Sequence, residues 1–175
     1  SDGEYSDSQS ISVTVNAVND APVATAGLSG VTDEDQSIVV ALSGSDIDGD
    51  NLTFSLDADA TNGSVTLDGS LATYTPDADY NGDDSFTFSV SDGEYSSSAD
   101  VTISISAVND APVLAAVSDV SFDEDGSGST DLSAADVDGD DLTYNITGGT
   151  DITATLDGSS VSFSAPDNYN GSEQF

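Results

Sequence analysis

The chain has 175 residues, of which 34 are acidic, and it contains no Lys, Arg, His or Cys. Salt bridges between side chains, disulfides and thiol chemistry are therefore excluded. The formal charge of −34 makes nucleic acids and anionic membrane surfaces unfavourable partners, because they carry charge of the same sign.

The predicted elements, taken in chain order, are all strands. In residues 1–19, Ile11, Val13 and Val15 alternate with polar residues, as in a strand with one buried face. The same alternation then predicts strands near residues 22–27, 37–42, 52–56, 64–67, 71–75, 84–90 and 99–106. Asp68-Gly69 and its copy Asp157-Gly158 predict hairpin turns. No segment has a helical period, and no apolar run is long enough to cross a bilayer, so we expect no membrane insertion.

The sequence repeats itself. Four motifs return ninety positions later, among them Asp33-Glu34-Asp35, which returns as Asp123-Glu124-Asp125. We therefore expect residues 1–19 to be the final strand of a preceding repeat, residues 20–109 a complete repeat, and residues 110–175 a second repeat without its final strand. About seven short strands per repeat predict an all-β fold of tandem Greek-key β-sandwich modules.

Each repeat also carries an acidic turn of the form Asp-x-Asp-x-Asp. The six residues concerned are Asp46, Asp48, Asp50, Asp136, Asp138 and Asp140. Two like charges about 4 Å apart repel by about 1 kcal/mol even in bulk water, so clustered carboxylates need cations from outside. We favour a Ca²⁺ site over a solvated turn, because Gly alone would form the turn and Asp oxygens are common Ca²⁺ ligands. An EF-hand is excluded, because Asn51 or Asp141 stands where that motif needs Gly and the flanks predict strands.

Catalysis is not expected. The chain lacks the His, Cys and Lys that usually serve as bases or nucleophiles. A pair of carboxylates can hydrolyse glycosides. However, the Asp clusters recur in both repeats, which indicates a structural role.

Several motifs in one order carry a resemblance to a known family. Val18-Asn19-Asp20-Ala21-Pro22-Val23 is followed by Asp46-Ile47-Asp48-Gly49-Asp50, by Tyr80-Asn81-Gly82 and by Ser85-Phe86-Thr87-Phe88. This order resembles the bacterial cadherin-like and Ig-like tandem repeats of large secreted adhesins of the RTX type. The resemblance implies β-sandwich modules in long secreted, extracellular or cell-surface chains, often with Ca²⁺ between modules.

Animal cadherins are similar at the residues that bind Ca²⁺. By this analogy, a Ca²⁺ cluster at the 109/110 junction would use Glu34, Asn109, Asp110, Asp136 and Asp138. A partial set near the chain start would use Asn19, Asp20, Asp46 and Asp48, while Glu124 would serve the following junction. For the Asn-Asp pairs, a turn before a proline is an equally good interpretation, and both can hold.

The leading hypothesis is a structural module that Ca²⁺ makes rigid, in an adhesin stalk or surface filament that mediates extension, cell adhesion or biofilm formation. Its partners would be neighbouring repeats of the same chain. An alternative is a filament subunit in which residues 1–19 of one chain complete the last repeat of an identical chain, head to tail. The opposing interpretation is that this sequence is a window cut from a longer array of repeats. A further alternative is a Ca²⁺-dependent carbohydrate-binding module that binds surface glycans.

Overall fold

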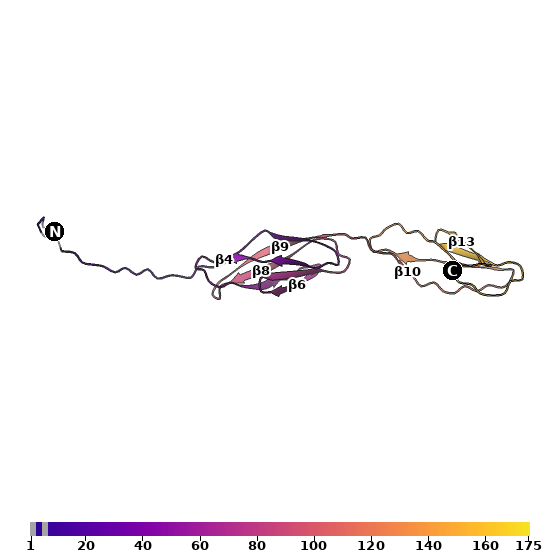
Figure 1. The fold of residues 1–175 in the computed structure, drawn as a ribbon, viewed down its shortest axis with the longest axis horizontal. Coiled ribbons are helices and arrows are strands. Elements are labelled where there is room, and N and C mark those ends of the chain that lie inside the picture. Colours follow the sequence, from indigo (N-terminus) through magenta and orange to yellow (C-terminus); the bar gives the residue numbers. More distant parts are fainter. Residues whose placement is uncertain (1–2, 5–6) are drawn as a thin grey trace. The chain divides into compact units, whose positions relative to one another are not determined.

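The computed structural model describes residues 3–4 and 7–175, and the expectations for residues 1–2 and 5–6 lie outside the described residues. The chain forms two compact units, Ser1–Ala107 and Val108–Phe175, which we describe separately. In both units the described residues form strands and turns, without a helix (Figure 1). Within this part of the chain there is accordingly no helix that could span a bilayer.

The first unit is a β-sandwich. Its strands are β1 (Val23–Ala24), β2 (Leu28–Asp33), β3 (Ile38–Ala41), β4 (Gly44–Ser45), β5 (Thr53–Ala58), β6 (Gly63–Asp68), β7 (Leu71–Pro76), β8 (Gly82–Ser91) and β9 (Ser96–Ser106). The larger sheet has the order β2-β9-β8-β5 and the smaller sheet the order β3-β7-β6, while β1 pairs with β4. These orders place strands that are distant in sequence side by side, which confirms the predicted sandwich of all-β type.

The core of this unit comes from the alternation seen in the sequence. Phe86, Phe88 and Val90 on β8 are at most 2% exposed, and the residues between them point away from the core. On the opposite sheet, Ala72 and Tyr74 of β7 are fully buried. The apolar faces of the two sheets therefore enclose one hydrophobic cluster.

Two strands were not predicted, β2 and β4, and the strand expected at 22–27 is confined to β1. The strand expected at Ile11, Val13 and Val15 is not formed, since the described residues 7–19 pair with no other strand and these side chains are exposed. Gly27, with φ of +78°, ends the extended run after β1. The chain then continues as β2, which pairs with β9 in parallel. Gly30 in the middle of β2 weakens the apolar pattern, yet a Cβ there would lie 3.1 Å from Ile103 Cδ1 and from Ile38 Cδ1. Close packing, which a sequence pattern does not reveal, thus accounts for the missed strand.

The second unit contains the same small sheet. Its strands are β10 (Val113–Leu114), β11 (Ser127–Asp131), β12 (Ala134–Ala135), β13 (Thr153–Asp157) and β14 (Ser160–Ser164). The order β11-β14-β13 and the pairing of β10 with β12 repeat those of β3-β7-β6 and β1-β4. The predicted hairpins are confirmed in both units, with φ of +60° at Gly69 and +62° at Gly158. Residues 118–123, the counterparts of β2, are described but form no strand.

In one packing contact, the large and the small residue have opposite positions in the two units. In the first unit Gly30 lies against Ile38. Their counterparts are Val120 and Gly128, and a Cβ on Gly128 would lie only 2.6 Å from Val120 Cγ1. The bulky and the small residue have therefore changed places, so that the space between the two segments stays filled.

This exchange predicts coupled stability effects. Gly30→Val should destabilise the first unit by about 1–3 kcal/mol through overpacking, and Ile38→Gly by about 2–5 kcal/mol through a cavity. The double variant Gly30→Val/Ile38→Gly, which copies the second unit, should lose at least about 0.5 kcal/mol less than the sum. Urea unfolding of the four proteins measures this coupling, and strictly additive losses would contradict it.

A buried carboxylate ties the loop before β6 to β8. Asp84 is 9% exposed and accepts hydrogen bonds from the backbone N–H of Ser85 (2.8 Å), Asn62 (2.9 Å) and Thr61 (3.2 Å), and from the Tyr74 hydroxyl (2.9 Å). Burial opposes ionisation of Asp84, but these donors outweigh it and hold its pKa below the ordinary value. Burial and the same hydrogen bond raise the pKa of Tyr74.

The second unit preserves this arrangement with a longer acid. Glu173 accepts the backbone N–H groups of Thr150 (2.8 Å), Asp151 (2.9 Å) and Ile152 (3.0 Å). These hydrogen bonds, first those from Asp151 and Thr150, lower the pKa of Glu173. Phe163 of the second unit takes the position that Tyr74 has in the first unit. The longer Glu173 side chain thus binds the backbone of the loop without a tyrosine hydroxyl beside it.

The Asp84 contacts predict a dependence of stability on pH. A folded pKa below the unfolded value means that the stabilisation is present above about pH 4 and is lost as the pH falls through the lowered pKa. Asp84→Asn should therefore cost about 2 kcal/mol at neutral pH and much less in strong acid. Asp83→Asn, which removes the same charge from an exposed position, is the control. Chemical unfolding across the pH range measures both, and equal losses for the two variants at neutral pH would count against this role of Asp84.

Candidate metal centre

The acidic turn of the first unit is organised around Asp46. One carboxylate oxygen, Oδ1, accepts the backbone N–H of Asp48 (2.9 Å), Gly49 (3.1 Å) and Asp50 (3.3 Å). Gly49 has φ of +81°, a conformation that favours Gly. The aspartate at the start of the motif therefore shapes the turn with one oxygen and leaves the other for a further interaction.

Two other segments are bound to this end of the unit. The backbone N–H of Asp20 donates to Asp48 Oδ2 at 2.8 Å, which ties the segment before β1 to the turn. The amide Nδ2 of Asn19 donates to Asp92 Oδ2 at 3.0 Å. The cadherin analogy grouped four residues, Asn19, Asp20, Asp46 and Asp48. Within the first unit, hydrogen bonds connect Asp20 to Asp48 and Asp48 to Asp46, whereas the side chain of Asn19 is bonded to Asp92.

Asp92 is a participant that the sequence reasoning missed. It lies in the turn between β8 and β9, where its Oδ1 accepts the backbone N–H groups of Tyr95 and Glu94, each at 2.7 Å. These bonds and the Asn19 amide lower the pKa of Asp92. The repetition of Ser1-Asp2-Gly3-Glu4-Tyr5 at Ser91-Asp92-Gly93-Glu94-Tyr95 was the available signal.

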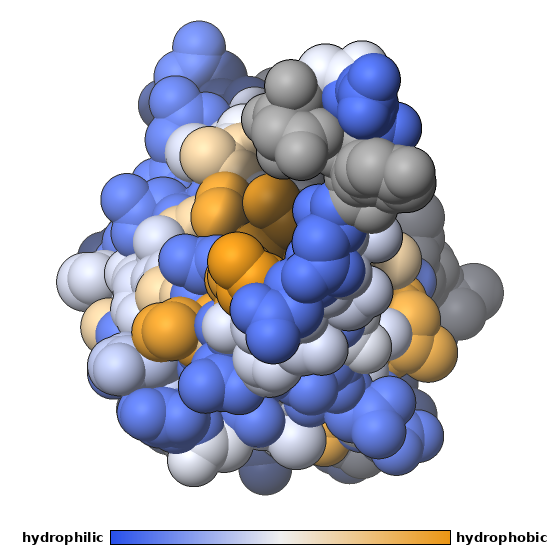
Figure 2. Space-filling view, turned by 90° about the vertical axis from the view of Figure 1, so that its left-hand side faces the viewer, coloured by the Kyte–Doolittle hydropathy of each residue, from blue (hydrophilic) through white to orange (hydrophobic). Residues whose placement is uncertain are grey.

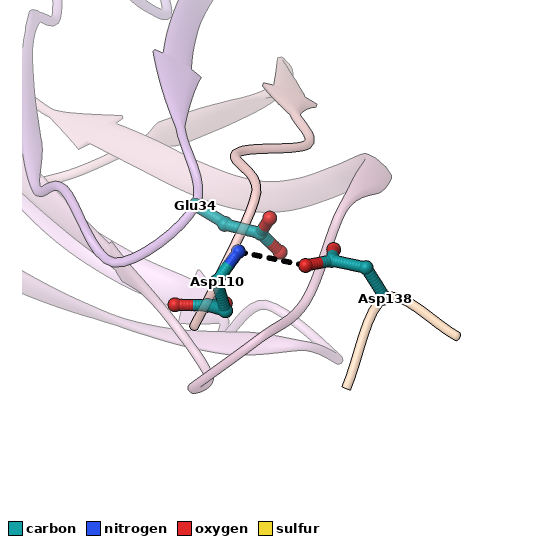
Figure 3. A group of neighbouring side chains, drawn as sticks. All are labelled: Glu34, Asp110 and Asp138. Atoms are coloured by element: carbon teal, nitrogen blue, oxygen red, sulfur yellow. Dashed lines mark hydrogen bonds between the residues drawn. The ribbon is translucent and has the colours of Figure 1, made fainter. Parts of the chain in front are cut away.

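The second unit repeats the turn with one change of acceptor, because the N–H of Gly139 donates to the backbone oxygen of Asp136 at 3.3 Å, whereas that of Gly49 donates to Asp46 Oδ1. The backbone N–H of Asp110 donates to Asp138 Oδ2 at 2.7 Å, as Figure 3 shows. Asp136 Oδ1 accepts the N–H groups of Asp138 (3.1 Å) and Asp140 (3.3 Å). Asn109 differs from Asn19, because its amide Nδ2 donates to the backbone oxygen of Asp110.

The oxygen atoms of the turn fit a hard divalent cation. Among the described residues, Asp46 Oδ2 is a buried atom that accepts no hydrogen bond. A buried carboxylate oxygen without a donor is costly, and the chain has no basic side chain to supply one. Ca²⁺ binds six to eight oxygens, and Asp side chains are among its usual ligands. A cation beside Asp46 would satisfy this oxygen.

The remaining predicted ligands occupy different places. Asp50 and Asp140 take part in the turns through their backbone N–H groups, and both residues are exposed. Glu34 is 3% exposed, its N–H donates to the Ser106 oxygen at 2.9 Å, and its Oε2 accepts from Asn81 Nδ2 at 3.4 Å. Glu124 is exposed.

Within the first unit, Glu34 does not meet the acidic turn. It follows β2 and is bonded to the last residue of β9, whereas Asp92 precedes the first residue of β9. A strand of 11 residues separates these ends by about 35 Å. The first unit therefore carries two separate acidic ends, with Glu34 at one and Asp46 at the other.

Comparison with solved structures finds partial similarity to cadherin domains and to a hydrolase. Human protocadherin-24 EC1-2 has 24% identity and a TM-score of 0.45, over 68% of this chain and 61% of that chain. Protocadherin gamma B7 domains 1-4 have 17% identity and a TM-score of 0.49, over 83% and 42%. The endo-fucoidan hydrolase MfFcnA4 has 22% identity and a TM-score of 0.44, over 88% of this chain and 25% of that chain.

The chain thus spans about a quarter of the hydrolase and less than two thirds of either protocadherin structure. No curated protein sequence matches it significantly. The family model for the bacterial Ig domain, in contrast, matches twice, at residues 19–104 and 109–175. Because these two matches cover nearly the whole sequence, the chain belongs to the bacterial Ig domain family.

Proposed function

We propose that the chain is a structural repeat of an extracellular adhesin stalk or surface filament, and that Ca²⁺ bound at its acidic turns makes it rigid. Bacterial Ig domains are typically extracellular and non-catalytic. The observation that carries the Ca²⁺ part is the buried Asp46 Oδ2, which accepts no hydrogen bond within the described residues.

The turn would restrict the chain segment that enters each unit. Asp20 is already bonded through its N–H to Asp48, and Asp110 is bonded in the same way to Asp138. A cation that contacts the carboxylates of both the entering segment and the turn would hold them together in addition to this single hydrogen bond. Such a contact would reduce the conformational freedom of the segment that leads into each unit. A rigid, extended array of units requires this restriction.

The charge of the chain supports the same function. Without cations, the 34 acidic groups repel one another and no basic side chain compensates them. Binding of Ca²⁺ to the folded turns would favour the folded state by mass action, by about 2.7 kcal/mol when the free ion is at a hundred times its dissociation constant. The protein would then be rigid where Ca²⁺ is abundant and looser where it is removed.

The first test is calorimetric titration with Ca²⁺, together with thermal unfolding with and without a chelator. Asp46→Asn keeps the oxygen that accepts the three N–H groups and replaces Oδ2 by an uncharged amide, so it should remove Ca²⁺ binding at the first turn. Asp136→Asn should do the same at the second turn, and the double variant should lose the Ca²⁺-dependent rise in melting temperature.

The matched control is Asp68→Asn/Asp157→Asn, which removes two charges from the equivalent hairpins of the two units. This control should bind Ca²⁺ as the unchanged chain does. A chain whose melting temperature does not respond to Ca²⁺ or to chelator would refute the proposed mechanism.

Glu34 stays a predicted ligand and has its own test. Glu34→Gln preserves the shape of the side chain but removes its charge, so it should weaken Ca²⁺ binding roughly tenfold or more if the carboxylate contacts an ion. Glu94→Gln, at an exposed turn, is the control for the lost charge. Unchanged affinity in Glu34→Gln would remove Glu34 from the ligand set and leave the Asp46 and Asp136 turns unaffected.

A further inference from the structure

Near its entry into the first unit and at its exit, the chain forms two neighbouring strands that run in the same direction. β2 pairs with β9 in parallel over six residue pairs, from Leu28 opposite Val101 to Asp33 opposite Ser106. The backbone N–H of Glu34 donates to the Ser106 oxygen at 2.9 Å and extends this ladder. The strand before β2 is β1, which has two pairs with β4. Tension on the chain on both sides of the unit would therefore reach the ladder between β2 and β9.

Such tension would load the ladder in shear. The chain is pulled at the beginning of β2 and at the end of β9, and because the strands are parallel these two points lie at opposite ends of the ladder. Bonds that are loaded from opposite ends share the load and lengthen together, whereas bonds that are loaded from one end break one after another. On its other side β9 is paired with β8 over ten residue pairs. The shorter ladder to β2 would therefore yield first.

The inner face of the sheet prevents β2 from sliding along β9. Leu28, Gly30 and Thr32 are its half-buried residues and alternate with exposed ones. A Cβ at Gly30 would lie only 3.1 Å from Ile103 Cδ1 and from Ile38 Cδ1. A slide by one residue turns every side chain to the opposite face, so the smallest slide that keeps the pattern is two residues, or about 7 Å. Tension would then bring Thr32 to the position of Gly30, where its side chain has no room.

The outer face of the ladder is open to water. Ser29, Thr102 and Ser104 are exposed, and Val31 is 70% exposed. Figure 2, which views the molecule from the side of the N-terminus, likewise shows a mostly hydrophilic surface with some apolar residues open to solvent. Water can replace a backbone hydrogen bond that opens alone. Resistance to tension therefore depends on bonds that are loaded together.

We propose that the parallel pair of β2 and β9 is a mechanical clamp that lets the first unit bear tension along the chain, and that the missing side chain at Gly30 fixes its register. Only the source of the tension depends on the proposed stalk or filament. The clamp itself consists of backbone hydrogen bonds and apolar packing, and it involves none of the acidic turns. Under load, the unit would keep its length until this ladder ruptures, instead of extending gradually.

The first test compares two directions of pulling on the full chain in a single-molecule force experiment. The chain contains no Cys, so introduced cysteines are unique attachment points. Handles at Ala21→Cys and Ala107→Cys load the ladder in shear, whereas handles at Gln36→Cys and Ala107→Cys pull on strand ends that lie together. At the same force, unfolding should be on the order of a hundredfold slower in the first direction, because several hydrogen bonds must break together.

This difference should be found both in Ca²⁺ and in chelator, so a failure of the proposed Ca²⁺ binding would leave it unchanged. Equal rates of unfolding in the two directions would overturn the clamp. The comparison needs no change inside β2 or β9, and so it does not depend on the folding of a strand variant.

A pair of proline variants tests the ladder itself, with handles at residues 21 and 107. N–H groups two residues apart in a strand point to the same edge, so the N–H of Thr32 faces β9 as that of Glu34 does. The N–H of Val31 faces the other edge of β2, which is the end of the sheet. Thr32→Pro should unfold roughly tenfold faster or more at the same force, because it removes a donor of the ladder. Val31→Pro, the matched control, should change the rate much less, and equal effects of the two prolines would count against the clamp.

A second pair of variants tests the role of Gly30. Thr32→Gly keeps every backbone donor but would let β2 slide by two residues, so unfolding under force should be roughly threefold or more faster than in the control Val31→Gly. Leu67→Ala, on β6 and outside the ladder, should lower the stability in urea without a comparable effect on the rate under force. A rate under force that merely follows the stability in urea across these variants would refute the proposal.

Discussion

Carboxylates in this chain are held by backbone N–H groups and hydroxyls, because no basic side chain exists to pair with them. Asp84 and Glu173 bind the backbone of the loop before β6 or β13, while Asp46, Asp92 and Asp136 shape turns. Hydrogen bonds from N–H groups stabilise a carboxylate but do not neutralise it. The folded protein therefore keeps its negative charge, and only cations from solution can compensate it.

The two acidic environments of the first unit have different consequences. At Asp84 the donors fill both oxygens, so the carboxylate is satisfied inside the unit and serves the fold. At Asp46 one oxygen takes three donors while the other is buried and accepts none among the described residues. The number of donors around each oxygen, more than the acidity of the sequence, separates a structural carboxylate from a candidate ligand.

The repeats show which features tolerate change. Three hydrogen bonds of the Asp turn are reproduced in both units, whereas Gly30 and Ile38 are replaced by Val120 and Gly128. A turn depends on particular atoms, so its residues are retained. A packed contact depends on total volume, so its residues can exchange sizes.

The sequence by itself determined the all-β class and the hairpins at Gly69 and Gly158, because these follow from period-two alternation and from local turn chemistry. The grouping of Asp20 with Asp46 and Asp48 came from the resemblance to cadherins, and the bond between Asp20 and Asp48 joins residues 28 positions apart. Tertiary structure alone decided that Gly30 belongs to a strand, since packing against Ile38 and Ile103 overrides its weak propensity. It likewise decided that Asp84 is a buried acceptor and that Asp92 supports Asn19. Those contacts join residues that are distant in the chain, and no local pattern encodes how many donors converge on one oxygen.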